Sequence, residues 1–309
     1  MAEFANAVQA GIGLPVEHFL ADCHDRAPGG STRAFAGLQV QANDGCVYPS
    51  SYHALLSALL SALQATLQAA ALPPGPVLDL ACGDGHLLQL LRATGRPLLG
   101  VDLSAGELAA ARTRLGDASK LWGDSVLLHQ ARAQALPLAD ASVAAITCHM
   151  ALMLMAEPAA VVTELRRVLK PGGRLLAVVP ATPGNAQQPG RADSLTLAWL
   201  AALAGLARQP RWHAVQFENR RWRDPATQAA LLQPGFRALR FTRLSTCQHL
   251  TPAQATAWFT GMYDLHLLSV DDRGAVEADF HARLAPLLDA NGRASLPFAT
   301  TLIDATAAP

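Results

Sequence analysis

This chain lacks paired cysteines, an excess of either charge and any recognisable cluster of metal ligands. Its five cysteines are scattered along 309 residues without a Cys-x-x-Cys pair, which argues against a disulfide framework or a structural zinc site. Lysine plus arginine and aspartate plus glutamate both number 24, whereas proteins that mainly bind a phosphate backbone usually carry a basic excess. His, Asp and Glu do not cluster at ligand spacing, so no metal is expected.

A membrane-spanning run and a secretion signal are also missing from the pattern. The most apolar stretch, residues 55–72, is interrupted by serine, threonine and glutamine, so it predicts an amphipathic helix and not a membrane span. Residues 1–6 lack the basic start of a signal peptide. A hydrophobic content of 51% with 16% charged residues indicates a compact globular protein. We therefore expect a cytoplasmic protein without membrane partners.

The strongest local signal is the stretch Val77-Leu78-Asp79-Leu80-Ala81-Cys82-Gly83-Asp84-Gly85-His86-Leu87. An apolar strand leads to an acid, a turn of small residues follows, and an uninterrupted apolar helix begins at His86. Small residues at 81, 83 and 85 allow unusual backbone angles and let a ligand approach the chain closely. The N–H groups of such a turn lie at a helix N-terminus. The pattern predicts a ligand-binding turn or, alternatively, an ordinary tight connection.

A second acid favours the ligand-binding alternative. Asp102 ends the apolar segment 97–101, at a place where a carboxylate commonly accepts hydrogen bonds from a ribose. A dinucleotide site would need a third glycine where this chain has Leu88, and Asp79 would repel a pyrophosphate. The expected cofactor thus carries a ribose and a positive charge but no phosphate. S-adenosyl-L-methionine meets this description.

At four places in the same order, the chain resembles the class I S-adenosylmethionine-dependent methyltransferases. Asp79-Leu80-Ala81-Cys82-Gly83-Asp84-Gly85 is similar to their acid-x-Gly-x-Gly-x-Gly motif, with Ala81 at the first glycine, and Asp102 matches their ribose-binding acid. Residues 135–143 resemble the segment before their fourth strand, and residues 165–175 resemble their helix, turn and fifth strand. The resemblance implies methyl transfer from S-adenosyl-L-methionine.

The resemblance also implies which residues contact the cofactor. Family members often carry an acid near the adenine amino group, but Arg132 stands there in this chain. Backbone groups around Arg132 and Ala133 are therefore expected to serve instead. An N-terminal aromatic residue often closes the cofactor cleft in the family, which suggests Tyr48 or Tyr52. The expected cofactor contacts are Asp79, Ala81, Cys82, Gly83, Gly85, Asp102, Leu103, Arg132, Ala133, Cys148, Tyr48 and Tyr52.

Strands and helices alternate across residues 76–180, which predicts a parallel sheet with helices on both faces. The resemblance implies an α/β, Rossmann-like, seven-stranded and mostly parallel sheet, whose last two strands form an antiparallel edge. Residues 1–75 are expected to be a helical N-terminal region or lid, and residues 76–309 the methyltransferase domain. Within that domain, 76–180 is the cofactor-binding core, and 184–223 and 251–292 are expected as helical lid insertions. Ser104 and Glu107 predict a capping box.

Candidate acceptor residues lie on the expected strand end and on the lid segments. His149 follows a predicted strand end, where open α/β sheets place ligands, so it is a candidate general base or acceptor contact, or else a partly buried histidine. Residues 208–223 hold five arginines and two tryptophans. Trp212 and Trp222 either stack on an anionic or aromatic acceptor or are buried under a solvated loop. Trp258 and Tyr263 are candidate pocket residues, although core packing explains the same helical spacing.

Three functions agree with these features. A small-molecule methyltransferase must hold an aromatic or anionic acceptor near attack distance, with a base where the acceptor carries a proton. An enzyme like the large-subunit rRNA guanine-N1 methyltransferases is the alternative, because the layout weakly resembles theirs. Those enzymes carry an N-terminal four-cysteine zinc module, whereas residues 1–50 offer only Cys23 and Cys46. A non-catalytic cofactor-binding paralogue is the third alternative, which Arg132 would support.

Overall fold

The computed structural model describes residues 16–64, 72–116, 126–182, 193–204 and 219–309. By its internal contacts the chain divides into two compact units. The sheet unit contains residues 20–181, 217–244 and 300–309, and the helical unit contains residues 1–19, 182–216 and 245–299. In the described part of the chain, no helix is both long enough and apolar enough to span a bilayer.

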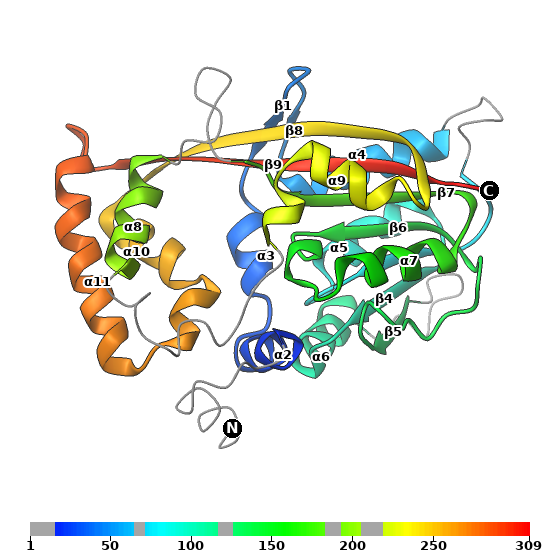
Figure 1. Ribbon diagram of the computed structural model, residues 1–309, viewed down its shortest axis with the longest axis horizontal. Coiled ribbons are helices and arrows are strands. Elements are labelled where there is room, and N and C mark those ends of the chain that lie inside the picture. Colours follow the sequence, from blue (N-terminus) through cyan, green and yellow to red (C-terminus); the bar gives the residue numbers. More distant parts are fainter. Residues whose placement is uncertain (1–15, 65–71, 117–125, 183–192, 205–218) are drawn as a thin grey trace. The chain divides into compact units, whose positions relative to one another are not determined.

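The strands form one nine-stranded sheet in the order β2-β1-β8-β9-β7-β6-β3-β4-β5 (Figure 1). The five strands β3 to β7 pair with one another in parallel. Strand β9 pairs with β7 in the antiparallel direction. The strands are β1 (Val40–Ala42), β2 (Val47–Tyr48), β3 (Val77–Leu80), β4 (Leu98–Asp102), β5 (Val126–Gln130), β6 (Val143–His149), β7 (Leu169–Pro180), β8 (Phe236–Leu250) and β9 (Ala294–Ala307).

The strand register brings three predicted functional segments to one edge of the sheet. Leu80 of β3 pairs with Val101 on β4 and with Cys148 on β6. Asp102 and His149 are the next residues on β4 and β6. Both residues therefore lie at the same edge of the sheet as the turn that follows β3. The carboxyl ends of parallel strands are where open α/β sheets bind ligands.

Helices cover both faces of the sheet because successive strand residues point to opposite sides. Leu78 and Leu80 belong to a buried cluster that includes apolar residues of α7 and α9, whereas Val77 belongs to a second cluster that includes residues of α4, α5 and α6. The helices are α2 (Val16–Arg26), α3 (Gly30–Phe35), α4 (Ser51–Gln64), α5 (His86–Leu91), α6 (Ala105–Leu115), α7 (Pro158–Val168), α8 (Ser194–Ala204), α9 (Pro225–Leu232), α10 (Pro252–Thr260) and α11 (Val270–Leu284).

The helical unit has a buried core of its own. Trp199 on α8 stacks on Phe259 of α10, with ring centroids 5.3 Å apart, and meets Phe280 of α11 edge-on at 5.3 Å. Thr251 and Gln254 form a complete capping box at the start of α10, which satisfies N–H groups that a helix start leaves without partners. The three aromatic rings pack among leucine, alanine and valine side chains of the same buried cluster.

The structure corrects the expected topology at the N-terminal region. Residues 40–48 form the hairpin β1–β2, which lies beside β8 and extends the expected seven strands to nine. The turn Asn43-Asp44-Gly45 makes this possible, because Gly45 adopts a φ of 92° that L-residues disfavour. By their internal contacts, residues 20–64 and 72–75 are grouped with the sheet strands. Their apolar side chains pack in the same cluster as sheet residues. The expected boundary at residue 75 stays a prediction.

Candidate functional site

The turn after β3 combines an acid with strained backbone. Ala81 has a φ of 55°, and Gly85 has a φ of 78° at the start of α5. A left-handed backbone is unfavourable for alanine, which explains why a glycine stands at the position of Ala81 in the similar family motif. Sequence reasoning placed this turn correctly because local residue types dictate its conformation.

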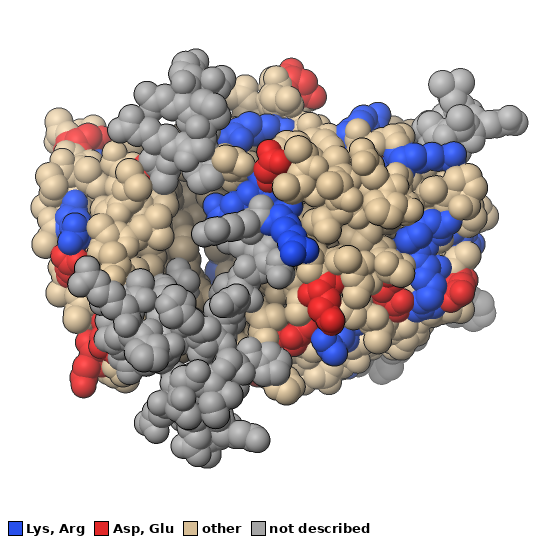
Figure 2. All heavy atoms as spheres, in the orientation of Figure 1, with Lys and Arg blue, Asp and Glu red and all other residues tan. Residues whose placement is uncertain are grey.

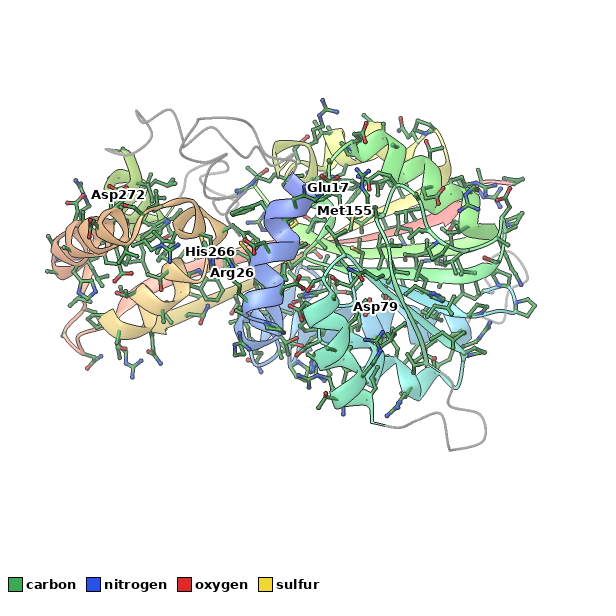
Figure 3. The ribbon with its side chains drawn as sticks, turned by 90° about the horizontal axis from the view of Figure 1, so that it is seen from below. Glu17, Arg26, Asp79, Met155, His266 and Asp272 are labelled. Atoms are coloured by element: carbon green, nitrogen blue, oxygen red, sulfur yellow. The ribbon has the colours of Figure 1, made fainter. Side chains whose placement is uncertain are left out.

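Asp79, which is labelled in Figure 3, lies on β3. Its side chain is buried, and one of its two carboxylate oxygens has no hydrogen-bond partner among the described residues. Thr147 on β6 donates a 2.9 Å hydrogen bond to Oδ1, whereas Oδ2 has no partner among the described residues. Burial raises the pKa of Asp79 from 3.8 to about 8, the hydrogen bond from Thr147 opposes this rise, and the charge of Asp102 adds to it. A buried carboxylate in this state would be stabilised by a positively charged ligand group.

Asp102 connects the turn to the neighbouring strand. Its Oδ2 accepts a 2.8 Å hydrogen bond from the Gly83 N–H, and its Oδ1 accepts one of 2.9 Å from the Ser104 N–H. Burial raises the pKa of Asp102, and these two N–H groups oppose the rise. Each carboxylate oxygen can accept two hydrogen bonds, so each retains capacity for a ribose hydroxyl. The residues present therefore fit a cofactor with a ribose and a cationic group.

Residues 24–35, here called the clasp, are held against this site by polar contacts. Asp25 accepts hydrogen bonds from the Ser104 hydroxyl at 2.6 Å and the Gly106 N–H at 2.8 Å. Thr32 donates a 2.5 Å hydrogen bond to Asp84 in the turn. The clasp therefore joins the turn after β3 to the turn after β4, which are the two sides of the expected cofactor site.

Glu107 makes the third attachment of the clasp. Its buried carboxylate accepts the Gly29 N–H at 2.9 and 3.0 Å and lies 2.8 Å from Nδ1 of His24. Burial lowers the pKa of His24, but the hydrogen bond and charge of Glu107 and nearby acids outweigh it, so the net pKa is raised. The predicted capping box is only half formed. Ser104 accepts the Glu107 N–H, but the Glu107 carboxylate turns to the clasp.

His149 lies in an aromatic cluster at the end of β6. Its ring stacks on Tyr52 with centroids 3.6 Å apart, Phe35 of the clasp meets it edge-on at 5.7 Å, and Tyr52 meets His86 edge-on at 4.8 Å. Nε2 lies 2.8 Å from the Ser51 hydroxyl, whereas Nδ1 is buried without a partner among the described residues. Burial, with a smaller contribution from His86, lowers the pKa of His149 to about 3.

This pKa bears on the chemistry that His149 can perform. A general base works best when its pKa lies near the operating pH, and an imidazole with a pKa of about 3 is a much weaker base. The lowered pKa of His149 therefore argues against the general-base alternative. It leaves the alternatives of an acceptor contact and of a buried core histidine.

The two tyrosines expected to close the cofactor cleft, Tyr48 and Tyr52, lie in different parts of the sheet unit. Tyr52 is buried against His149, and a hydrogen bond links it to Thr32 of the clasp. Tyr48 belongs to the edge strand β2, separated from β3 by β1, β8, β9, β7 and β6. Its hydroxyl shares a hydrogen bond with Ser57 on α4. Of the two candidates, Tyr52 is therefore the one that the fold brings to the site.

The remaining expected cofactor contacts surround the strand ends. Leu103 and Cys82 belong to the turns after β4 and β3, and Cys148 is fully buried on β6. Arg132 follows β5 with an exposed side chain, and Ala133 is buried beside it. The Ala131 N–H donates to the Asp102 carbonyl at 3.1 Å, so the backbone here is tied to the segment that is expected to bind the ribose. Their contacts with the cofactor stay predictions.

The structure gives each of the other expected acceptor residues that it describes its own surroundings. Trp222 is fully buried in the aliphatic cluster that includes α7 and α9, so it cannot stack on an acceptor as packed here. Trp212 lies outside the described residues. Trp258 meets Phe298 edge-on at 5.8 Å, and Tyr263 meets Phe19 edge-on at 6.3 Å. Both pairs belong to the helical unit, and their acceptor role stays a prediction.

Several site residues carry no signal in the sequence. His24, Thr32 and Ser51 lie far in sequence from their partners Glu107, Asp84 and His149. No spacing rule connects residues 52 to 98 positions apart, so only the tertiary structure reveals them. Within the described ranges, the structure contains no group of three or more His, Cys, Asp or Glu able to hold a metal ion.

Comparison with known proteins agrees with this geometry. A family model described as a methyltransferase domain matches residues 78–177. The ubiquinone/menaquinone biosynthesis C-methyltransferase UbiE of Rubrivivax gelatinosus is 32% identical over 187 residues, which are 59% of this chain and 71% of that protein. The demethylmenaquinone methyltransferase of Symbiobacterium thermophilum is 34% identical over 114 residues, which are 36% of this chain and 45% of that protein. The chain spans about half the length of several curated relatives that it matches.

Solved structures share the fold at low sequence identity. The YcgJ protein of Bacillus subtilis has a TM-score of 0.53 and 19% identity, covering 83% of this chain and 99% of its own. The (4+2)-cyclase SpnF has a TM-score of 0.53 and 19% identity, covering 96% of this chain and 98% of its own. Such likeness establishes the fold alone, and one fold hosts different reactions.

Proposed function

Because the chain belongs to the class I S-adenosylmethionine-dependent methyltransferases, we propose that it transfers a methyl group to a small aromatic acceptor bearing an oxygen that ionises. The observation that carries this proposal is the aromatic cluster at the end of β6. There His149, Tyr52 and Phe35 pack together and one ring nitrogen has no partner among the described residues. Such a cluster suits a flat apolar ring with one polar group.

The cofactor side of the proposal rests on two carboxylates. When bound, S-adenosylmethionine supplies a methyl group on a positively charged sulfur, which makes that methyl carbon open to in-line attack. Asp102 would hold the ribose hydroxyls through its remaining acceptor capacity. The unpaired Oδ2 of Asp79 would attract the cationic part. The clasp would exclude water from this edge of the sheet.

The acceptor side draws on the relatives as well. The relatives compared above are named as C-methyltransferases of ubiquinone and menaquinone biosynthesis and as demethylmenaquinone methyltransferases. Their names refer to quinones, and the reduced form of a quinone is an aromatic hydroquinone, which favours a phenol or hydroquinone over a basic amine as acceptor here. Such a ring gains nucleophilic character when its hydroxyl is ionised. The transfer then needs mainly an acceptor held near attack distance.

A nucleic-acid acceptor is the alternative outcome. On the face that Figure 2 draws, the arginine and lysine side chains form separate patches with acidic side chains among them. The balance of 24 basic and 24 acidic residues agrees with this view. Binding of a nucleic-acid backbone usually depends on a basic stripe, so the proposal favours the small molecule.

The test is transfer of an isotopically labelled methyl group from S-adenosylmethionine. Hydroquinones, simple phenols, hydroxylated aromatic acids and total RNA are incubated separately with the full chain. We expect label in an aromatic product and none in RNA. Asp102→Ala, which weakens cofactor binding, should abolish this label, and Asp140→Ala, on the exposed loop before β6, should retain it. Label in RNA alone, or in no acceptor, would contradict the proposal.

A further inference from the structure

Ser51 begins α4, and its hydroxyl has few places to donate its hydrogen. A serine inside a helix often donates to the carbonyl four residues earlier, but the first residue of a helix has no such carbonyl within that helix. Ser51 is 3% exposed, which removes water as a ready partner. The partner present is Nε2 of His149 at 2.8 Å. The hydrogen bond is satisfied when the Ser51 O–H donates to Nε2.

This direction of donation decides the tautomer of His149. A neutral imidazole has one N–H and one bare nitrogen. If Nε2 accepts from Ser51, the proton must reside on Nδ1. Nδ1 then becomes a buried N–H donor, and the described residues provide no acceptor for it. An unsatisfied buried donor costs roughly 1–3 kcal/mol, and such groups are rare in folded proteins. A hydrogen-bond acceptor on a bound ligand would satisfy this donor.

From this geometry we propose that His149 donates a hydrogen bond from Nδ1 to the ionised oxygen of the methyl acceptor, and that Ser51 is the positioning residue that fixes the required tautomer. The proposal rests on the proposed function, because it names the acceptor group that the same site recognises. The acceptor is an aromatic oxyanion that has lost its proton to solvent. His149 takes no proton and keeps its own throughout.

The surroundings of His149 agree with a donor role. Stacking on Tyr52 fixes the plane of the ring, and a preorganised donor stabilises charge without reorienting. Burial disfavours the imidazolium and keeps the pKa of His149 at about 3, so the ring stays neutral at working pH. Phe35, which meets the ring edge-on, belongs to the clasp. Displacement of α3 would therefore uncover the ring for an entering acceptor.

The first test reads the tautomer directly and needs no substrate. Nitrogen NMR of the full chain with labelled histidine distinguishes a proton on Nδ1 from one on Nε2, and the spectrum of His149→Gln identifies the signal among ten histidines. We expect a neutral ring with the proton on Nδ1 from about pH 5 to pH 8, where an ordinary histidine titrates. Ser51→Thr should retain this state, and Ser51→Ala should lose it. A proton on Nε2 in the unaltered chain would overturn the proposal.

The second test separates the two ring nitrogens by substitution. Asparagine at position 149 places an amide near the position of Nδ1, whereas glutamine reaches the position of Nε2. His149→Gln should lower kcat by about a hundredfold to a thousandfold, the range for loss of an oxyanion donor, and His149→Asn should lower it less. Cofactor affinity should stay unchanged in both variants. A larger loss in His149→Asn than in His149→Gln would overturn the assignment to Nδ1.

The third test measures the positioning role of Ser51. Ser51→Ala should lower kcat roughly tenfold to a hundredfold, as loss of the partner that orients a functional histidine does, and Ser51→Thr should restore it. Ser61→Ala is the matched control, because Ser61 is an exposed residue of the same helix whose hydroxyl donates to the Ser57 carbonyl. If Ser51→Ala lowers the melting temperature but leaves the NMR tautomer and kcat unchanged, the positioning role is wrong.

An optical probe keeps this proposal distinct from the proposed function. With S-adenosylhomocysteine present, 4-nitrophenol should bind in its coloured ionised form, and His149→Gln should remove the shift in its ionisation. Failure of every aromatic acceptor to become methylated would contradict the proposed function while leaving this binding intact. A nitrophenol that does not bind, or that ionises equally in both proteins, would overturn the donor role.

Discussion

The cofactor end of the sheet unit and the core of the helical unit are held together by different forces. At the cofactor end, Asp84, Asp102 and Glu107 each accept hydrogen bonds from separate chain segments. In the helical unit, Trp199 and its aromatic neighbours pack without any such network. Directional contacts position ligand-binding groups, whereas aromatic packing contributes stability through buried area. Damage to the first region should therefore appear in ligand affinity and damage to the second in stability.

The largest expected effect breaks the helical core. Trp199→Ala should lower the free energy of unfolding of the helical unit by about 3–5 kcal/mol, because it leaves a large cavity between Phe259 and Phe280. Hydrogen exchange of the α8 and α11 amides measures this loss. Leu197→Ala on the same helix is the control, since Leu197 is 46% exposed. Unchanged exchange in Trp199→Ala, or an equal effect of Leu197→Ala, would contradict the description of this core.

The next effect concerns the cofactor end. Asp102→Ala should weaken binding of S-adenosylmethionine by about 2–4 kcal/mol, because it removes charge-assisted hydrogen bonds to the ribose. Titration calorimetry measures the affinity. Asp140→Ala serves as the control, because the Asp140 side chain is 79% exposed and pairs with Arg167. Equal affinity in Asp102→Ala and the unaltered protein would refute the ribose assignment.

A smaller effect tests the clasp. A Cβ atom at Gly106 would lie 2.9 Å from the Asp25 Cα, so Gly106→Ala must displace the clasp. We expect a loss of cofactor affinity of about 1–3 kcal/mol, comparable with overpacking elsewhere. The raised pKa of His24 should fall towards its ordinary value as the contact with Glu107 is lost, which proton NMR detects.

The matched control for this substitution lies in the helical unit. A Cβ at Gly274 of α11 meets nothing within 4 Å, so Gly274→Ala should stabilise the protein by about 0.5–1 kcal/mol through helix propensity and leave cofactor affinity unchanged. If both glycine variants bind the cofactor equally well, the clasp does not contribute to binding.

The last expected effect is a pH dependence caused by Asp79. Without cofactor, its raised pKa of about 8 keeps the carboxyl protonated at neutral pH, whereas a cationic ligand favours the ionised form. Binding should therefore release a proton, and affinity should rise by at most about tenfold per pH unit up to pH 8 and then level off. Calorimetry in buffers with different ionisation heats counts the proton. Asp79→Asn should abolish this release.

The same pKa has a consequence for stability without cofactor. The unfolded chain ionises Asp79 above its ordinary pKa of 3.8, but the folded chain does so only near 8. Between pH 3.8 and about pH 8, unfolding therefore releases one proton from Asp79. As the pH rises through this range, Asp79 lowers the free energy of unfolding. The contribution of Asp79 is measured as the difference in free energy of unfolding between the unaltered protein and Asp79→Asn. If this difference rises with pH in the same range, the carboxyl is not buried as described.

The family and the cofactor end were predictable from sequence because they depend on local patterns. The acid of Asp79, the small turn and the acid of Asp102 fall on consecutive βα units, whose geometry is nearly invariant. The hairpin at residues 40–48 was missed, because strands of three and two residues are too short for an alternating pattern to stand out in the sequence. For Trp222 the sequence left two alternatives open, an acceptor contact and a buried residue, because composition alone does not reveal which side of a loop is buried. The structure buries it.

The sequence by itself determined the strand–turn–helix units, the positions of the two acids at strand ends, and the kind of cofactor. These follow from residue type and short spacing, which act within one turn of chain. Only the tertiary structure decided that the clasp joins the two cofactor turns and that Ser51 meets His149 across 98 positions. It also decided that Tyr52, and not Tyr48, stacks at the site. Such contacts depend on how strands are ordered in the sheet, and long-range order is a property of packing that no local pattern encodes.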